Sequence, residues 1–556
     1  MSMRLLLILL TIAWPMLAGA QSAAPPQNWQ HLDKLSDGYM GVSSELTYEK
    51  LLKGKKSTPV IVAVIDGGVD PYHEDLKDVM WRNPGEIADN GIDDDGNGYI
   101  DDVYGWNFIG GKDGRNVHRD QLEITRLVAY YQKKFDGVSA SELKGKAKKE
   151  YERYLELKET VEEQQRKAMN NYKMYKGVLE SVNQVLEAIG KEEPSAEDLR
   201  NFKSDNPALI QASQILASMI EDGNTVEEVK HQIQEGIDYF DSQANYHYNV
   251  ELDVRPIVGD NYENSYERYY GNNDVKGPDA THGTHVAGII GARRHNGIGM
   301  DGIADNVLIM AVRCVPDGDE RDKDVANAII YAVDNGASII NMSFGKGYSW
   351  DKEAVDKAVR YAEKHDVLLI HAAGNSGQNN DEEDNFPNDT YARRGLFGPK
   401  KAKNWIEVGA LSWKGGQEAV ASFSNYGKKN VDLFAPGVAI YSTTPDDTYQ
   451  KLQGTSMAAP VVAGVAAMLR SYYPDLSAAQ VKDILMSTTV RSQDMNMVKK
   501  PGSDGELVPF TDLCVTGGVV NAFEAVKKAE TVKGKKKHKK GKRGVAPASV
   551  GKPNRA

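Results

Sequence analysis

Residues 56–70 read KSTPVIVAVIDGGVD. From 60 to 65 the stretch is an unbroken apolar run rich in β-branched residues, which is typical of a parallel strand buried on both faces. The run ends in a carboxylate, Asp66. Because ligand and catalytic groups of open α/β sheets lie at the carboxyl ends of strands, Asp66 is a candidate functional residue.

Five further apolar runs follow, with helical patterns between several of them. The runs cover residues 307–312, 337–342, 367–371, 405–410 and 431–434, and the helical patterns include 324–335 and 351–365. Strands that alternate with helices predict an α/β fold with a doubly wound, mainly parallel sheet.

The segment 121–246 differs from the rest of the chain. It is rich in Lys, Glu, Gln and Tyr, and its apolar residues recur at helical spacing. Ser195 with Asp198, and Thr225 with Glu228, have the spacing of capping boxes that open helices. We therefore predict an inserted α-helical subdomain, which splits the α/β domain into residues 58–120 and 247–530.

The chain begins with a typical export signal. Arg4 precedes an apolar run from 5 to 17, and Ala18-Gly19-Ala20 forms a small-residue cleavage site. We expect residues 1–20 to be a signal peptide, residues 21–57 to be an N-terminal extension, and the protein to be exported, either periplasmic or secreted.

The charge is distributed unevenly. The formal net charge is −12, yet residues 531–556 contain eight Lys, two Arg and no acid, which leaves −22 for the rest of the chain. An acidic body argues against a nucleic-acid partner. The basic tail is either a disordered, solvated extension or a contact with an anionic surface. The two cysteines, Cys314 and Cys514, allow one disulfide or two buried thiols.

Three candidate catalytic residues stand in separate motifs. Ser456 lies in QGTSMAAPVVAG (453–464), where a serine at the start of a helix either caps it or acts as a nucleophile. His282 opens HGTHVAGIIGA, which lacks the glutamate of a zinc-binding HExxH motif. With Asp66 these residues complete an acid, base and nucleophile set.

On the motifs VAVIDGGVD (62–70), HGTHVAGIIGA (282–292) and GTSMAAPVVAGVAA (454–467), the chain resembles the subtilisin-like serine peptidases, or subtilases. The resemblance implies an endopeptidase acting on polypeptides through an acyl-enzyme, with Ser456 as nucleophile, His282 as base and Asp66 as its orienting acid. It also implies that Asn375 stabilises the oxyanion, that His285 is structural, and that there is no organic cofactor. The segments that flank the primary specificity pocket, for which we expect an apolar preference, would be Ser343, Phe344, Gly345, Ala372, Ala373 and Gly374.

An acidic, glycine-containing loop predicts a structural Ca²⁺ site. The spacing resembles that of an EF-hand loop through its ninth position, whereas the twelfth residue is Tyr104 and not glutamate, so Asp102 is a candidate to complete the ligand set. The alternative is an acidic surface turn. The predicted ligands are the side chains of Asp93, Asp95, Asn97 and Asp101, with the carbonyl of Tyr99.

Two departures from the subtilase pattern leave alternatives open. Gly67 follows Asp66 where subtilases usually have Ser or Thr, and fewer than 40 residues separate the cleavage site from residue 58, too few for a compact propeptide. Folding then proceeds without one, or the insertion assists folding or covers the cleft. A narrow-specificity processing enzyme and a noncatalytic binding protein on the same scaffold are the competing functions.

Overall fold

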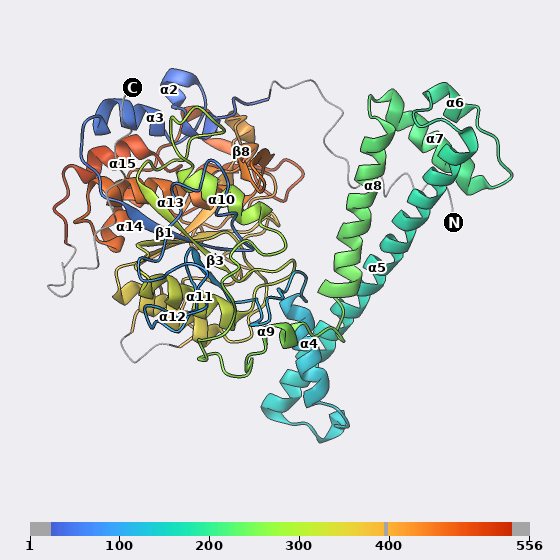
Figure 1. Ribbon diagram of the computed structural model, residues 1–556, viewed down its shortest axis with the longest axis horizontal. Coiled ribbons are helices and arrows are strands. Elements are labelled where there is room, and N and C mark those ends of the chain that lie inside the picture. The colour runs from blue at the N-terminus through green and yellow to red at the C-terminus, as the bar shows by residue number, and fades with distance from the viewer. Residues whose placement is uncertain (1–23, 394–397, 536–556) are drawn as a thin grey trace.

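The computed structural model describes residues 24–393 and 398–535, and its centre is a seven-stranded sheet (Figure 1). The predicted signal peptide and residues 536–556 of the predicted tail lie outside the described residues. All seven strands are parallel, in the order β2-β3-β1-β4-β5-β6-β7. Their bounds are β1 Val60–Asp66, β2 Gly105–Asn107, β3 Val307–Arg313, β4 Ile339–Met342, β5 Leu368–Ala372, β6 Trp405–Leu411 and β7 Leu433–Pro436.

Helices cover both faces of the sheet. Val62 and Val64 of β1 belong to the core cluster that includes residues of α10 (Thr281–Gly291) and α13 (Thr455–Tyr472). Ala63 and Ile65 point to the other face, into the cluster that includes residues of α11 (Asp322–Asp334) and α12 (Lys352–Lys364). Successive side chains of a strand point to opposite faces, so an unbroken apolar run suits a strand covered on both sides. The predicted doubly wound α/β fold is confirmed.

The six predicted strands are present with ends shifted by two residues at most, whereas β2 was not predicted from the sequence. Two antiparallel hairpins were also missed, β8 (Ile440–Thr444) with β9 (Thr448–Leu452) and β10 (Met497–Lys499) with β11 (Leu507–Pro509). The remaining helices outside the insertion are α2 Lys34–Asp37, α3 Ser44–Thr47, α9 Arg255–Val258, α14 Ala478–Ser487 and α15 Ala522–Ala529.

The order of the strands brings a crevice to the end of β1. After β1 the chain first forms β2 and β3 on one side of it and then β4 to β7 on the other. Ligand sites of doubly wound sheets lie outside the carboxyl ends of the strands where the order reverses in this way. Asp66, the last residue of β1, lies at this point.

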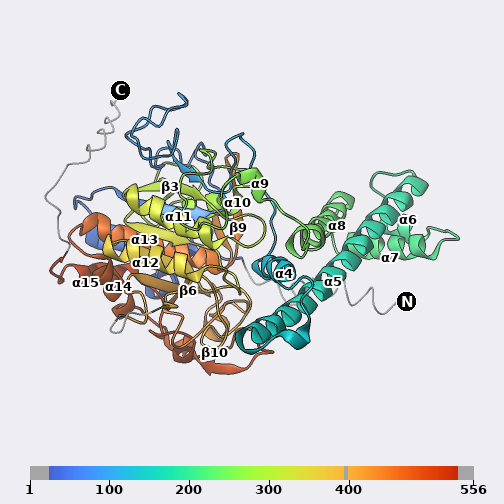
Figure 2. The same ribbon diagram turned by 90° about the horizontal axis from the view of Figure 1, so that it is seen from below.

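Residues 121–246 form helices that project from the sheet domain as an arm (Figures 1 and 2). The long helix α5, of 45 residues, spans about 68 Å at 1.5 Å per residue and packs along α8. Both predicted capping boxes are present, Ser195 before α6 and Thr225 before α8. The helices are α4 Glu123–Lys134, α5 Gly145–Ile189, α6 Ala196–Arg200, α7 Pro207–Glu221 and α8 Val226–Asp241.

Buried ion pairs fasten the arm to the sheet domain. The carboxylate of Glu123, at the start of α4, accepts from Arg126 (2.7 Å) and from Lys346 of the sheet domain (2.9 Å). Asp120 pairs with Arg321 at 2.8 Å. All five side chains are buried, and buried charges require partners because desolvating an unpaired ion is costly. The root of the arm is therefore held in one geometry.

The N-terminal extension is part of the α/β core. Trp29 is fully buried in the core cluster of α10 and α13, and its indole donates to the carbonyl of Val438 at 3.1 Å. Near the C-terminus, the backbone N–H of Ala522 donates to the carbonyl of Val42 at 2.8 Å. The described part of the extension is thus integrated in the fold and does not form a separate unit.

Trp29→Ala is expected to lower the free energy of unfolding by about 3–5 kcal/mol, because it opens a cavity in a fully buried site. Thermal or urea unfolding measures the loss. Leu35→Ala is the matched control from the same segment, since Leu35 is 97% exposed and its loss should change the stability by less than about 0.5 kcal/mol. A Trp29→Ala change below about 1 kcal/mol would contradict the integrated role of this segment.

Both cysteines are buried free thiols, so the alternative of one disulfide is wrong. In the part of the chain that the structure describes, none of the helices combines the length and the apolar character needed to span a bilayer.

Candidate active site

Asp66 and His282 form a hydrogen-bonded ion pair at the crevice. Nδ1 of His282, the second residue of α10, lies 2.8 Å and 3.0 Å from the two carboxylate oxygens of Asp66. Asp66 is 3% exposed, and its Oδ1 also accepts the backbone N–H of Gly67 at 2.7 Å. The backbone amide thus fixes the carboxylate where a hydroxyl side chain is absent.

The electrostatics of this pair favour a positively charged imidazole. Burial lowers the pKa of His282, but the charge of Asp66, its hydrogen bond and the charge of Asp279 together raise the pKa above its ordinary value of 6.5. With Nδ1 hydrogen-bonded to Asp66, the other ring nitrogen, Nε2, is the one available to accept a proton.

Ser456 lies in the first turn of α13, beside the end of β4. Its hydroxyl donates to the backbone carbonyl of Ser343 at 3.1 Å, and the Ser343 hydroxyl donates to the carbonyl of Ser456 at 2.9 Å. In this arrangement Ser456 and His282 are not hydrogen-bonded to each other. Such contacts are often long or missing in a protein without substrate, and a rotation about the Cα–Cβ bond changes them.

Asn375 is held against the same helix start. Its side-chain oxygen accepts from the backbone N–H (2.8 Å) and the hydroxyl (2.9 Å) of Thr455. Because the oxygen is engaged, the amide Nδ2 is the group left to donate to a ligand. Gly454 has a φ of +152°, and a Cβ there would lie 3.4 Å from this Nδ2, so glycine leaves the amide uncrowded. The role of Thr455 was not predicted from the sequence.

The two predicted substrate segments lie side by side. Ser343 follows β4 and Ala372 ends β5, and these strands are neighbours in the sheet. Asn385 Nδ2 binds the carbonyls of Ala372 (3.2 Å) and Ala373 (3.1 Å). The rest of the predicted set, Phe344, Gly345 and Gly374, lies next to these residues in the same two segments.

His285 lies in a different environment from His282. It is fully buried, and its Nε2 donates to the carbonyls of Ile440 (3.0 Å) and Gln450 (3.1 Å). Burial lowers its pKa to about 4, so the ring is neutral. These contacts tie α10 to the β8–β9 hairpin.

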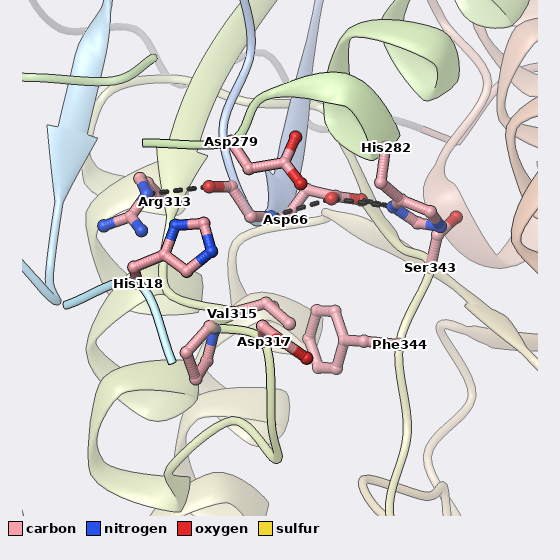
Figure 3. A pocket seen from close by; sticks show the side chains of 11 residues that line it. Asp66, His118, Asp279, His282, Arg313, Val315, Asp317, Ser343 and Phe344 are labelled. Carbon is pink, nitrogen blue, oxygen red and sulfur yellow. Dashed lines mark hydrogen bonds and ion pairs between the residues drawn. The ribbon is translucent and has the colours of Figure 1, made fainter. Parts of the chain in front are cut away.

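A pocket of about 240 Å³ opens beside Asp66 and His282 (Figure 3). Asp279 and Asp317 line it from different segments, and neither was predicted from the sequence. Asp279 lies three residues before His282, so a search for acids near the histidine motif would have found it. No signal in the sequence places Asp317 there. The other lining residues are Gly67, His118, Arg313, Val315, Pro316, Ser343 and Phe344.

The structure groups the predicted ligand Asp95 and the candidate Asp102 with a third carboxylate, that of Glu86. Oxygens of Glu86, Asp95 and Asp102 lie within 4.8 Å of one another, and Glu86 was not predicted. The Asp93 carboxylate instead accepts backbone N–H groups of its own loop, from Asn97 and Gly98.

Two further predicted ligands, Asp101 and Asn97, form hydrogen bonds within the same loop. Asp101 accepts the N–H groups of residues 90 and 91, and Asn97 Nδ2 donates to Asp95 (3.2 Å) and Asp102 (3.1 Å). The remaining predicted ligand, Tyr99, is buried, and its backbone N–H donates to the Asn97 side chain at 2.8 Å.

These three carboxylates fit a hard cation. None of the Lys, Arg or His side chains in the described ranges forms an ion pair with Glu86, Asp95 or Asp102. One buried oxygen of Glu86, Oε2, has no hydrogen-bond partner. Burial raises the pKa of Asp102 to about 7. An oxygen-only donor set with uncompensated negative charge is what Ca²⁺ prefers.

Comparison with protein families matches residues 57–507 to the subtilase family. Over 241 residues the chain is 38% identical to the thermophilic serine proteinase of Bacillus sp. (strain AK1), covering 43% of this chain and 51% of that relative. It is 39% identical over 216 residues to subtilisin DY of Bacillus licheniformis, covering 38% of this chain and 72% of that relative.

A solved structure of a protease from Pseudoalteromonas arctica PAMC 21717 is 29% identical, with a TM-score of 0.37, and the match covers 46% of this chain and 78% of that one. The chain spans about half the length of the thermophilic relative. The family match, in contrast, extends over more than three quarters of the chain and includes all three motifs. The chain belongs to the subtilase family.

Proposed function

We propose that this chain is an exported endopeptidase that cleaves polypeptides through Asp66, His282 and Ser456. The observation that carries the proposal is the ion pair between His282 and the buried Asp66, 2.8 Å long, beside the helix start that bears Ser456. A nucleophilic serine needs a base within reach and an acid that orients the base. Family membership supports the same chemistry.

The chemistry begins with Ser456. Its hydroxyl turns from the Ser343 carbonyl toward Nε2 of His282, gives up its proton and attacks the substrate carbonyl carbon. Asp66 holds the imidazole in the tautomer with Nδ1 protonated and stabilises the imidazolium that forms. His282 then protonates the leaving amine, which leaves an acyl-enzyme. Water hydrolyses this ester by the same steps, with His282 again acting first as base and then as acid.

The negative charge of the tetrahedral intermediate needs donors aimed at its oxygen. The free Nδ2 of Asn375 supplies one donor, and the backbone N–H of Ser456 in the first turn of α13 supplies a second, together with the positive end of the helix dipole. The hydrogen bonds from Thr455 fix the Asn375 side chain in advance, so little reorganisation is needed during the reaction.

Asn375→Ala is expected to lower kcat by roughly 100- to 1000-fold, the range known for loss of an oxyanion donor in subtilisin. KM should change little, because the oxyanion forms only in the transition state. Steady-state kinetics on a fluorogenic peptide measure both constants. The loss of kcat should be far larger than for Asn404→Ala, whose side chain binds the carbonyl of Val367 before β5 and not the site. Equal kcat losses in both variants would contradict the assigned role.

The proposed activity is tested by labelling the purified mature protein with a fluorophosphonate probe. Labelling of the wild type, and none of Ser456→Ala, is expected if Ser456 is activated by His282. An unlabelled wild type with a normal circular-dichroism spectrum and a cooperative unfolding transition would overturn the proposed function. It would favour a noncatalytic binding protein on this scaffold.

We further propose a structural Ca²⁺ site at Glu86, Asp95 and Asp102. Asn97, Asp93, Asp101 and the carbonyl of Tyr99 remain candidate ligands in the same loop. When bound, Ca²⁺ would neutralise the three carboxylates and hold the loop that leads into β2. It has no part in the steps of peptide hydrolysis.

Chelation of Ca²⁺ is expected to lower the melting temperature by about 2 °C or more, since a cation at 100 times its Kd stabilises a protein by about 2.7 kcal/mol and a chain of 556 residues has a large entropy of unfolding. Differential scanning calorimetry with Ca²⁺ or with a chelator measures the shift. Asp102→Asn should melt at the same temperature in both conditions. A wild type indifferent to chelation, with no bound Ca²⁺ by elemental analysis, would refute the site.

We also propose that residues 1–20 direct export of the protein and that the basic tail contacts an anionic surface. Mass spectrometry of the secreted protein would test the cleavage before Gln21. Binding of the full chain, against a chain ending at residue 530, to vesicles with and without anionic lipid would test the tail.

A further inference from the structure

The pocket beside His282 contains one carboxylate without an ion pair among the described residues, that of Asp279, and a second that is partly exposed, that of Asp317. Three carboxylates line it, those of Asp66, Asp279 and Asp317, and Figure 3 shows the latter two on different sides of it. The pocket lies between the predicted substrate segment at Ser343 and the segment that follows β3. A substrate chain bound along the Ser343 segment would therefore place a side chain in it.

Asp279 carries a charge without a cationic partner. It is exposed, and its Oδ1 accepts the backbone N–H of Thr281 at 2.9 Å. Within the described residues, no Lys, Arg or His lies within ion-pair distance of it. Its charge acts on His282, whose pKa it helps to raise. The carboxylate is thus free to bind an incoming cation.

Asp317 is held in the pocket wall by the root of the helical arm. Its carboxylate accepts from Ser242 Oγ at 2.8 Å and from His247 Nε2 at 3.0 Å. Burial raises the pKa of Asp317, but these hydrogen bonds and the nearby positive charges outweigh it and leave the pKa below its ordinary value. Arg119 approaches at 3.6 Å but makes its shorter contact, 2.8 Å, with Asp241. Asp317 therefore stays ionised, and its side chain is 42% exposed.

Arg313 also lines the pocket and its positive charge acts on Asp279, but its N–H groups bind neutral oxygens and not the pocket carboxylates. Arg313 is buried, and its guanidinium donates to the Gly67 carbonyl (2.7 Å), to the Asn107 side chain (3.1 Å) and to the Val117 carbonyl (2.6 Å). All its nitrogens are engaged with the protein. His118 is exposed at the pocket and forms no ion pair within the described chain.

The walls between the carboxylates are apolar. Val315, Pro316 and Phe344 line the pocket together with the acids. Lys and Arg combine an apolar stem with a charged end, so they match a pocket with apolar walls and carboxylates at its margins. We propose that this pocket is a specificity subsite that takes a Lys or Arg side chain of the substrate close to the scissile bond. The proposal rests on the proposed endopeptidase function and names the class of its substrates.

A fluorogenic peptide library that varies each position around the scissile bond tests the subsite. One position is expected to favour Lys and Arg over the uncharged, similarly long norleucine by about tenfold or more in kcat/KM. This ratio in the wild type should fall as NaCl rises from 50 mM to 1 M, because salt screens a partly exposed charge pair. A ratio near one at every position would overturn the subsite.

Asp279→Asn and Asp317→Asn should each lower the Lys-to-norleucine ratio by about three- to fivefold, and the double variant should bring it close to one. Asp483→Asn is the matched control, since Asp483 is an exposed acid on α14, next to Lys482, which binds the Trp405 carbonyl at the opposite edge of the sheet. The control should keep the wild-type ratio. Ratios unchanged in both pocket variants would overturn the assignment of these acids.

Fluorophosphonate labelling tests the endopeptidase function separately from the specificity subsite. Labelling of the wild type without preference for Lys or Arg would overturn the subsite alone. Absence of labelling would overturn the endopeptidase function, and the subsite with it. A folded pocket variant that is still labelled shows that a lost ratio reflects the subsite and not an inactive protein.

Discussion

Ser456→Ala is expected to lower kcat by on the order of 10⁶-fold, the loss seen when the nucleophile of a catalytic triad is removed. No neighbouring side chain replaces it: the adjacent Ser343 hydroxyl donates to the Ser456 carbonyl, and the Thr455 hydroxyl donates to Asn375. What remains is stabilisation by the oxyanion donors and substrate binding, which still exceeds the rate in water by about 10³- to 10⁴-fold. Hydrolysis of a fluorogenic peptide at saturating concentration measures the loss.

The control for this variant is Ser471→Ala on the same helix. Ser471 is buried, and its hydroxyl donates to the carbonyl of Thr58 at 2.8 Å, remote from the site. It should lose some stability and keep kcat within a few-fold. Retention of more than about 1% of wild-type kcat in Ser456→Ala, with contaminating proteases excluded, would show that another residue acts as the nucleophile.

Asp66→Asn is expected to lower kcat by about 10⁴-fold while leaving the fold intact, because the amide is nearly isosteric but favours the wrong tautomer of His282. The hydrogen bond between residue 66 and Nδ1 of His282 would persist, but the asparagine amide would donate it and Nδ1 would accept it. The imidazole would then present N–H and not a lone pair to Ser456. Stopped assays with long incubation, together with thermal unfolding of the variant, separate a loss of catalysis from a loss of structure.

The pH dependence gives Asp66→Asn a second readout. His282 must be unprotonated to act as base, so activity rises with pH, and its midpoint in the wild type should lie above 6.5 because the pKa of His282 is raised. Removing the charge of Asp66 removes the largest influence that raises this pKa. The midpoint should therefore move to lower pH, and a profile that stays in place would contradict the role of Asp66.

Much of the fold follows from local patterns in the sequence. The run from 60 to 65 has apolar side chains on both of its faces, and only a strand covered on two sides buries them all. The capping boxes at Ser195 and Thr225 predicted helix starts because they satisfy backbone N–H groups within one turn. These signals involve residues that are close in the sequence, so they can be recognised without knowledge of the rest of the chain.

Other features depend on contacts between distant segments. The loop spacing predicted Asp93 and Asp101 as metal ligands, but their carboxylates accept backbone N–H groups. The structure groups Asp95 and Asp102 with Glu86. The short strand β2, of three residues, carries no periodicity to detect, and it exists because its backbone pairs with β3, some 200 residues later in the chain.

The sequence by itself determined the parallel α/β core, the helical insertion and the candidate triad, because a local pattern or motif predicts each of them. Only the tertiary structure decided the surroundings of the site. It brought Asp317 to the pocket through Ser242 and His247 of the arm, and it buried Trp29 in the core. These contacts join residues up to several hundred positions apart, and side-chain packing and charge pairing over such separations leave no periodic trace in the chain.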